Sequence, residues 1–274
     1  MSLREFGLEG KVATVTGAGR GMGKQISLAL AEAGADIVAV ARTRSEIEET
    51  AEEIRSIGRT CLPIQADVTK TAEVDEMAET AVSRFGKIDI LVNHAGTSIR
   101  KPIVPLPKFK PAWVKQEKAS NFLTRTSDEE WNHVMHTNLT SMFLCARAVG
   151  PHMIKQNKGK IINTSSFAGE RGFPYMISYC TSKAAINMFT RSLAIEWARY
   201  GINVNAIAPG YTRTSLTEPV IFDDEKIMER TMRSIPLKRF CNPREVGILV
   251  VYLSSDAADY ITGQIIRIDG GLLA

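Results

Sequence analysis

Short apolar runs alternate along the chain with longer stretches in which apolar residues recur every three or four positions. The apolar runs predict seven buried β-strands, at residues 12–16, 37–41, 61–65, 88–92, 160–164, 203–208 and 265–268. The periodic stretches predict six helices, at residues 22–33, 46–57, 72–85, 128–155, 179–200 and 244–254. Strand runs that are apolar throughout are typical of a parallel sheet covered on both faces. The alternation therefore predicts an α/β fold with a doubly wound parallel sheet.

Three predicted helices carry capping signals where they begin. Ser45 with Glu48, and Ser127 with Glu130, match the Ser-x-x-Glu capping box, in which side chain and backbone bond reciprocally. Asn242 precedes a proline, which fits an N-cap followed by proline at the first helical position. These signals predict where the three helices begin.

Two segments, at about 97–125 and 212–235, interrupt the regular alternation. The first contains four prolines, which exclude a regular helix. Long insertions in a compact fold are usually functional lids or disordered loops. No linker, repeat or low-complexity tract divides the chain, so we expect residues 1–274 to form one domain with an insertion at about 97–125 and a substrate lid at about 212–235.

Composition and charge are those of an ordinary globular protein. Hydrophobic residues make up 44% and charged residues 23% of the chain, and a net charge of +4 does not by itself imply nucleic acid. The four cysteines show no CxxC spacing, so neither a metal site nor a disulfide framework is expected. The N-terminus lacks the apolar segment of a signal peptide, and no apolar run approaches the length of a membrane span. We expect a cytoplasmic protein without nucleic-acid or membrane partners.

A glycine-rich segment follows the first predicted strand and opens directly into the first predicted helix. Gly17 permits a tight turn, while Gly21 and Gly23 remove side chains where a pyrophosphate must approach amides at a helix N-terminus. The strand–turn–helix context indicates a nucleotide site rather than an ordinary turn. The candidate cofactor contacts here are Gly17, Gly19, Arg20, Gly21, Met22 and Gly23.

The end of the second predicted strand bears on the choice of cofactor. No acid follows that strand until Glu46, whereas an acid at its end would bind the ribose 2′-hydroxyl and repel a 2′-phosphate. Arg42, helped by Arg20 or Arg44, could pair with a 2′-phosphate. We therefore favour NADP(H), with NAD(H) as the alternative if these arginines are solvated surface charges. Asp67, after the third strand, is placed either to contact adenine or to close a turn.

A Tyr-x-x-x-Lys spacing places Tyr179 and Lys183 on one face of a predicted helix. A cation there would lower the tyrosine pKa from about 10 towards working pH and make the phenol a usable general acid or base. Ser166, thirteen residues before Tyr179, adds a hydroxyl. Taken alone, the spacing is also typical of a helical surface pair, because chance supplies it in many chains.

Taken together and in this order, the motifs resemble the short-chain dehydrogenase/reductase family, in its compact single-domain branch, over nearly the whole chain. Beyond the glycine segment and the Tyr-x-x-x-Lys pair, the resemblance rests on Asp67-Val68, Asn93-His94-Ala95-Gly96, Asn138-Leu139-Thr140-Ser141, Ser165-Ser166, Pro209-Gly210 with Thr214, Thr262-Gly263-Gln264 and Asp269-Gly270-Gly271. The resemblance implies a Rossmann-type sheet of about seven strands and an oxidoreductase acting on a carbonyl or alcohol. It also implies a homotetramer.

The resemblance further implies a catalytic tetrad of Asn138, Ser166, Tyr179 and Lys183. Tyr179 would exchange a proton with the substrate oxygen, and Ser166 would hold that oxygen by a hydrogen bond. Lys183 would lower the Tyr179 pKa and bind the nicotinamide ribose, and Asn138 would hold a water of a proton relay. Ser165 is expected to be structural. The further implied cofactor contacts are Asp67, Val68, Asn93, Ala95, Gly96, Tyr179, Lys183, Pro209, Gly210, Thr212 and Thr214.

Two features depart from the family pattern. His94 replaces the usual second asparagine of Asn-Asn-Ala-Gly, and we expect it to be structural. The 97–125 segment exceeds the family's usual connection by about fifteen to twenty residues. Its basic residues, against Glu117 alone, are Arg100, Lys101, Lys108, Lys110, Lys115, Lys118 and Arg125. The segment is either a solvated basic loop or the rim of a substrate mouth that favours an anion, such as a carboxylate or an acyl-thioester carrier.

The same residues also bear on other possible functions. Isomerases, epimerases and dehydratases on related scaffolds are generally longer and carry a separate substrate domain. A cofactor-sensing scaffold would typically have lost the tyrosine, lysine or serine, all of which are present here. Enoyl reductases space their tyrosine and lysine more widely. An NAD-dependent alcohol dehydrogenase of the same family is the nearest alternative to an NADP-dependent enzyme for a small-molecule carbonyl or alcohol.

Overall fold

The computed structural model describes residues 4–105, 124–214 and 217–274, and these contain one seven-stranded sheet. The strands are β1 (Val12–Thr16), β2 (Asp36–Ala41), β3 (Cys61–Gln65), β4 (Ile90–Asn93), β5 (Gly159–Thr164), β6 (Ile202–Pro209) and β7 (Ile265–Ile268). They lie in the order β3-β2-β1-β4-β5-β6-β7, and every neighbouring pair is parallel. The predicted doubly wound parallel sheet is confirmed.

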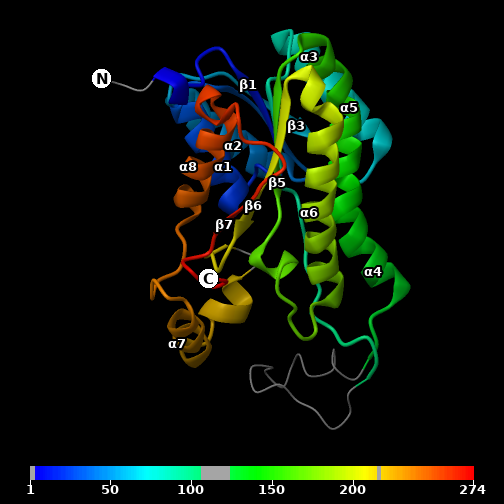
Figure 1. Cartoon of the computed structure of the whole chain (residues 1–274), viewed down its shortest axis with the longest axis vertical. Helices are drawn as coiled ribbons and strands as arrows, with labels where there is room; N and C mark the ends of the chain where they lie inside the picture. The colour runs from blue at the N-terminus through cyan, green and yellow to red at the C-terminus, as the bar shows by residue number, and fades with distance from the viewer. Residues whose placement is uncertain (1–3, 106–123, 215–216) are drawn as a thin grey trace.

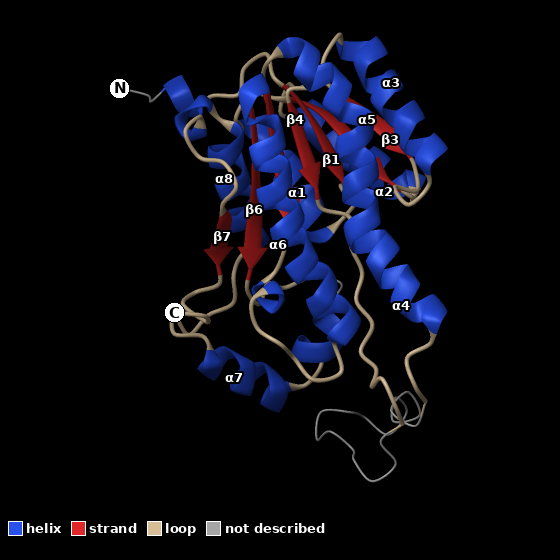
Figure 2. Cartoon of the chain, turned by 45° about the vertical axis from the view of Figure 1, so that its right-hand side comes forward, coloured by secondary structure: helices blue, strands red, loops and turns tan. Residues whose placement is uncertain are grey.

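Helices cover both faces of this sheet (Figure 1). One face carries α1 (Gly21–Glu32), α2 (Arg44–Ser56) and α8 (Pro243–Ser254). The other face carries α3 (Thr71–Phe85), α5 (Ser141–Gln156) and α6 (Ile177–Trp197). The helix α4 (Asp128–Met135) leads into α5, and α7 (Glu225–Ser234) lies beyond the arrowheads of β6 and β7 (Figure 2). Short 3-10 turns occupy Arg4–Phe6, Phe167–Gly169, Ala198–Tyr200 and Asp256–Ala258.

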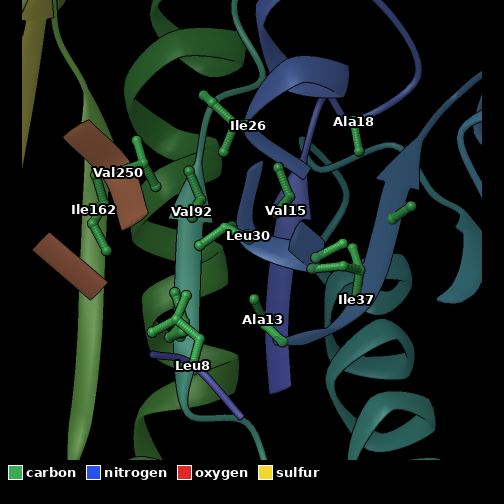
Figure 3. Close-up of a cluster of buried hydrophobic side chains, with 14 of the residues drawn as sticks. Leu8, Ala13, Val15, Ala18, Ile26, Leu30, Ile37, Val92, Ile162 and Val250 are labelled. Atoms are coloured by element: carbon green, nitrogen blue, oxygen red, sulfur yellow. The ribbon is translucent and has the colours of Figure 1, made fainter. Parts of the chain in front are cut away.

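Alternate residues of each central strand serve two separate hydrophobic cores. In β1, Ala13 and Val15 face the core of α1, α2 and α8, whereas Val12 faces the core of α3, α5 and α6. Ile26 and Leu30 of α1 lie against the strands in the first of these cores (Figure 3). Because the central strands are buried on both faces, every residue of β1 and β4 is buried, which explains why apolar residues dominate their sequences.

The two edge strands differ from the sequence expectation. Most residues of β3 and β7 are only partly buried, so the prediction of seven fully buried strands is wrong at both edges. A strand at the edge has a neighbour on one side only and less cover from helices. The edge position also accommodates Pro63 in β3, because the missing N–H can face away from the ladder.

Two of the predicted helix caps are confirmed. At α4, the Ser127 Oγ accepts from the Glu130 N–H at 3.2 Å, and the Glu130 carboxylate accepts from the Ser127 N–H at 2.8 Å. At α8, Asn242 and Glu245 form the same reciprocal box.

The third cap prediction is wrong. Helix α2 begins at Arg44 behind Thr43, which forms no side-chain cap bond, so Ser45 lies inside the helix. Glu48 instead accepts from Arg44 Nε at 2.8 Å, because residues four apart meet on one helix face.

The two segments that interrupted the alternation are partly described. Segment 212–235 contains a π-helical turn (Glu218–Phe222) and the helix α7, which the sequence analysis did not predict. The insertion is described at its ends, whereas Lys108, Lys110, Lys115, Glu117 and Lys118 lie outside the described residues. Within the described ranges, no helix combines the length and apolarity needed to cross a bilayer.

Candidate active site

The carboxyl ends of the strands lead into a cavity of about 890 Å³. It extends from the point where the sheet reverses its winding, between β1 and β4. A Cβ at Gly17, after β1, would lie 3.1 Å from the Ala95 Cα, after β4, so the two loops meet closely there. In open α/β sheets this switch point is where ligands bind, and the volume suits a small-molecule ligand.

The loop after β1 fits a dinucleotide pyrophosphate. A Cβ at Gly23 would lie 2.0 Å from the Gly17 carbonyl oxygen and 2.8 Å from His94 Cδ2, so only glycine fits. Gly17 and Gly21 adopt positive φ angles of 71° and 54°. Helix α1 begins at Gly21, and its N-cap residue Arg20 forms no side-chain cap hydrogen bond. The first amides of α1 therefore have no acceptor from their own cap and can bind a phosphate.

Most of the predicted cofactor contacts line the cavity: Gly17, Gly19, Arg20, Gly21, Met22, Arg42, Asp67, Val68, Ala95, Gly96, Tyr179, Lys183, Pro209, Gly210, Thr212 and Thr214. Gly23 and Asn93 do not. Gly23 packs beneath the loop against Gly17. Asn93 is buried in the sheet, where its Nδ2 donates to Asn163 Oδ1 at 2.9 Å. The Asn93 side chain therefore joins β4 to β5, and the contact of this residue with the cofactor stays a prediction.

Opposite charges meet at the end of the cavity beside β2. Arg42, Arg20 and Glu46 all line it, and Arg20 Nη1 lies 3.3 Å from Glu46 Oε1. Arg44 does not line the cavity and pairs with Glu48. Arg42 is therefore the arginine best placed to meet a 2′-phosphate, and the suggested help from Arg44 is not supported.

Asp67 closes the turn after β3 and also lines the cavity. Its Oδ1 accepts from the Thr69 N–H at 3.0 Å and from the Thr69 hydroxyl at 2.7 Å, which closes the turn after β3. Asp67 also lines the cavity. The turn role is confirmed, and the adenine contact stays a prediction.

Three residues of the predicted tetrad meet at the inner wall of the cavity. Tyr179 and Lys183 lie on α6, and the Lys183 Nζ is 5.6 Å from the centre of the Tyr179 ring. Ser166 follows β5, and its Oγ accepts from the Ala168 N–H at 3.1 Å. Lys183 is buried, and its Nζ donates to the Thr164 carbonyl at 2.7 Å.

Burial controls the protonation of these side chains. Burial lowers the pKa of Lys183 to about 7. Burial also raises the pKa of Tyr179 above its usual value, against the opposing effects of the Ser166 hydroxyl and the Arg100 guanidinium. The net shift of the Tyr179 pKa is therefore opposite to the predicted lowering, because desolvation outweighs the groups that favour the phenolate.

Asn138, the fourth predicted residue, does not line the cavity. It lies in a π-helical turn (His136–Thr140) between α4 and α5, so the helix predicted over 128–155 is interrupted. The backbone at Met135 and Ser141 stays right-handed helical, so the chain runs from α4 through the turn into α5 without a loop. Such widened turns occur frequently at functional sites.

The Asn138 amide holds backbone and helix together rather than contacting Lys183 directly. Its Oδ1 accepts from the Thr97 N–H at 2.7 Å. Its Nδ2 donates to the Thr97 carbonyl at 3.0 Å and to Ser182 Oγ on α6 at 2.9 Å. A Cβ at Gly96 would lie 3.3 Å from Asn138 Oδ1 and 3.8 Å from Lys183 Nζ, so glycine leaves the space between them open.

Ser165 and His94 make contacts that support the site. The Ser165 Oγ bonds to the Lys183 carbonyl at 3.1 Å and to Asn187 Oδ1 at 2.5 Å. The His94 Nδ1 lies 3.2 Å from Thr164 Oγ1, the residue whose carbonyl holds Lys183. Burial, reinforced by the Lys183 charge, lowers the pKa of His94 to about 4, so this ring is neutral at neutral pH.

Sequence reasoning missed an aromatic wall in the cavity. The ring of Phe167 lies 5.1 Å from that of Phe173 and 4.9 Å from that of Tyr211, in edge-to-face contacts. All three line the cavity. Phe167 directly follows Ser166 and Tyr211 directly precedes Thr212, so adjacency to predicted site residues was the available signal.

Arg100 brings the start of the insertion into the site. It lines the cavity near Tyr179 and Tyr211, and burial lowers the pKa of its guanidinium against the effect of these phenols. Lys101 instead pairs with Glu130. Of the seven basic residues that suggested an anionic substrate, Arg100 is the one in the described ranges that lines the cavity.

Known proteins share this architecture. Residues 17–273 match the family model described as Enoyl-(Acyl carrier protein) reductase. The chain is 39% identical over 275 aligned positions to the 2-dehydro-3-deoxy-D-gluconate 5-dehydrogenase of Escherichia coli, covering 100% of both. It is 39% identical over 263 positions to a 3-oxoacyl-[acyl-carrier-protein] reductase of Staphylococcus epidermidis, covering 96% of this chain and 98% of that protein.

Solved structures agree with these sequence matches. The gluconate 5-dehydrogenase of Burkholderia cenocepacia, solved in complex with NADP and tartrate, superposes with a TM-score of 0.86. It is 34% identical, and the match covers 99% of this chain and 98% of that chain. The relatives named here are dehydrogenases and reductases of CH–OH and carbonyl groups. The chain therefore belongs to the short-chain dehydrogenase/reductase family and is an NAD(P)-dependent oxidoreductase of CH–OH groups.

Proposed function

We propose that this enzyme transfers a hydride between NADP(H) and the carbonyl or secondary alcohol carbon of a small anionic substrate. The observation that carries the proposal is one cavity that joins the glycine loop to Tyr179, Ser166, Lys183 and Arg100. The loop fits a pyrophosphate, the hydroxyls fit proton transfer to an oxygen, and the guanidinium fits a carboxylate.

The residues divide the work around the reacting oxygen. The nicotinamide cofactor, when bound, supplies or accepts the hydride. Tyr179 donates its proton to the carbonyl oxygen during reduction, and Ser166 donates a hydrogen bond to the same oxygen as its negative charge develops. The raised pKa of Tyr179 keeps the phenol protonated at neutral pH, which suits its role as the acid in reduction.

Lys183 supports proton movement behind Tyr179. With a pKa of about 7, its ammonium exchanges a proton near neutral pH and can restore the tyrosine's proton. Asn138 holds the Thr97 backbone and Ser182 near the lysine. We propose that the water of the proton relay lies between Asn138 and Lys183. Oxidation of an alcohol would use the same groups in the opposite direction.

The cofactor preference is tested at Arg42. We expect Arg42→Ala to raise the KM for NADPH about tenfold or more, with little change for NADH, because one charged contact to the 2′-phosphate is lost. Arg44→Ala is the matched control, since Arg44 pairs with Glu48 outside the cavity. Better kinetics with NADH in the wild type would favour the alternative cofactor, for which Glu46 is placed to accept from the ribose hydroxyls.

The substrate class follows from Arg100 and the aromatic wall. A partly buried guanidinium near Tyr179 suits a carboxylate, and the relatives from Escherichia coli and Burkholderia cenocepacia carry gluconate in their names. The rings of Phe167, Phe173 and Tyr211 favour an apolar chain instead, which supports a 3-oxoacyl thioester as the second candidate.

Oxidation of NADPH, followed by absorbance, distinguishes these candidates. The panel holds 5-keto-D-gluconate, a 3-oxoacyl thioester and neutral ketones of similar size. We expect the keto acid to have the highest kcat/KM, and Tyr179→Phe to lower the rate by about 10²–10⁴-fold while NADPH still binds. Turnover that survives this substitution would contradict the assignment of Tyr179.

We also propose a homotetramer and a lid. Met188 and Ile195 of α6 are 59% and 81% exposed although they are apolar and share one helix face, which supports contact with another copy. Ile227, at the start of α7, lines the cavity, which supports 212–235 as the substrate lid. Light scattering after gel filtration tests the assembly, and a monomer at micromolar concentration would refute it.

A further inference from the structure

We infer that the ion pair between Lys101 and Glu130 is a positioning device that holds Arg100 at the active site. The inference rests on the proposed anionic substrate, because its functional consequence is recognition of a carboxylate by Arg100. Neither Lys101 nor Glu130 lines the cavity, so both act through the backbone that carries Arg100.

The backbone on both sides of Arg100 is fixed. Thr97 is held through both its N–H and its carbonyl by the Asn138 amide, at 2.7 and 3.0 Å. Lys101, directly after Arg100, donates its N–H to the Tyr175 carbonyl at 2.8 Å. Its Nζ lies 2.7 and 2.8 Å from the two carboxylate oxygens of Glu130. Only three residues separate these two anchors, so the position of Arg100 is closely constrained.

Glu130 also holds the returning end of the insertion. Its carboxylate accepts from the Ser127 N–H at 2.8 Å in the capping box of α4. Thr126, one residue earlier, donates its N–H and its hydroxyl to the Pro102 carbonyl, both at 2.9 Å. One carboxylate therefore joins the outgoing end, the returning end and the first turn of α4.

The ion pair between Lys101 and Glu130 is partly shielded from solvent. The Lys101 side chain is 14% exposed and that of Glu130 32% exposed. Pairs between fully exposed side chains contribute little, whereas removing one partner of a shielded pair leaves the other charge poorly compensated. Breaking this pair should therefore loosen the base of the insertion.

Two variants distinguish positioning from simple electrostatic attraction. Lys101→Met removes a positive charge near the mouth, whereas Glu130→Gln removes a negative one. Attraction alone would raise the KM for an anion in the first variant and lower it in the second. Positioning raises the KM in both variants, because each breaks the same pair.

A matched control accounts for loss of the helix cap. Glu130→Gln keeps an oxygen that can accept from the Ser127 N–H, so α4 retains most of its cap. Glu245 has the same arrangement at α8, where it accepts from the Asn242 N–H at 2.8 Å and pairs with Arg239 at 2.7 Å. Glu245 does not line the cavity, so Glu245→Gln tests stability effects alone.

Two measurements test the inference. The first is amide hydrogen exchange at Lys101 and Thr126, which should become at least about tenfold faster in Lys101→Met and Glu130→Gln and stay unchanged in Glu245→Gln. The second is steady-state kinetics with 5-keto-D-gluconate and its neutral methyl ester. We expect the KM for the acid to rise at least about fivefold in both variants, with kcat within about twofold and the ester unaffected. In an Arg100→Met background, Lys101→Met should add nothing further.

Each other outcome has a defined meaning. Three results would each overturn the positioning role: unchanged amide exchange at Lys101 and Thr126, opposite KM shifts in the two variants, or KM effects of Lys101→Met and Arg100→Met that add fully. Faster exchange with an unchanged KM would also overturn it, provided that Arg100→Met itself raises the KM for the acid. If Arg100→Met leaves that KM unchanged, or if the wild type does not turn over the acid, the proposed anionic substrate fails. The exchange experiment then still decides whether the pair anchors the insertion.

Discussion

Replacing His94 with asparagine, the residue usual in the family, should remove part of the enzyme's sensitivity to acid. Burial and the nearby Lys183 lower the pKa of His94 from 6.5 to about 4 in the folded state. Because the folded pKa is below the unfolded one, the unfolded chain takes up this proton first as the pH falls. His94 therefore leaves stability intact above pH 6.5 and reduces it progressively as the pH falls towards 4.

The size of the effect follows from the two pKa values. The complete change from pH 6.5 down to below 4 corresponds to about 3 kcal/mol of unfolding free energy. At pH 5, linkage gives a loss of about 2 kcal/mol. That is a large fraction of the 5–15 kcal/mol that stabilises typical domains, taken as an approximate range.

Urea unfolding at pH 7.5, 6.5, 5.5 and 5 measures this loss. We expect the wild type to lose about 2 kcal/mol more than His94→Asn between pH 7.5 and 5. Thr164→Val removes the hydrogen-bond partner of His94 but keeps the titrating ring, so it should retain the acid sensitivity. Parallel stability curves for the wild type and His94→Asn would refute the buried, neutral histidine.

Three further substitutions test other parts of the structure. Gly23→Ala places a Cβ 2.0 Å from the Gly17 carbonyl oxygen, so it should lower the free energy of unfolding by about 1–3 kcal/mol and weaken NADPH binding in fluorescence titrations. Gly172→Ala, which has open space around its Cβ, should change neither. Between pH 7 and 10.5 the unfolded chain keeps the Lys183 proton while the folded protein loses it, so the wild type should gain up to about 1.4 kcal/mol of stability per pH unit. Lys183→Met should abolish this rise. An unaltered slope in urea titrations would contradict the lowered pKa of Lys183. Ser127→Ala should cost about 1 kcal/mol in urea unfolding through loss of the α4 cap, and no loss would show that the box contributes nothing.

The sequence was sufficient for the framework because the relevant signals are local. All seven strands were predicted to within two residues, since strands covered by helices consist mainly of apolar residues. The glycine loop, Tyr179 and Lys183 were identified from spacing because a turn or a helix places such residues predictably. The helix α7 was missed although its apolar residues share one face, since it lies within the 212–235 segment that was predicted as a lid and none of its residues is buried in the core.

The sequence by itself therefore determined the family, the positions of the seven strands and the candidates for the reacting side chains. Only the tertiary structure decided how these side chains are set: burial lowers the pKa of Lys183 to about 7 and raises the pKa of Tyr179. It also placed Asn138 in a π turn, where its amide holds the Thr97 backbone. It alone showed that Arg100 reaches the cavity while Lys101 turns to Glu130. The physical reason is that spacing depends on a residue's neighbours in the chain, whereas burial and charge pairing depend on segments brought together by the fold.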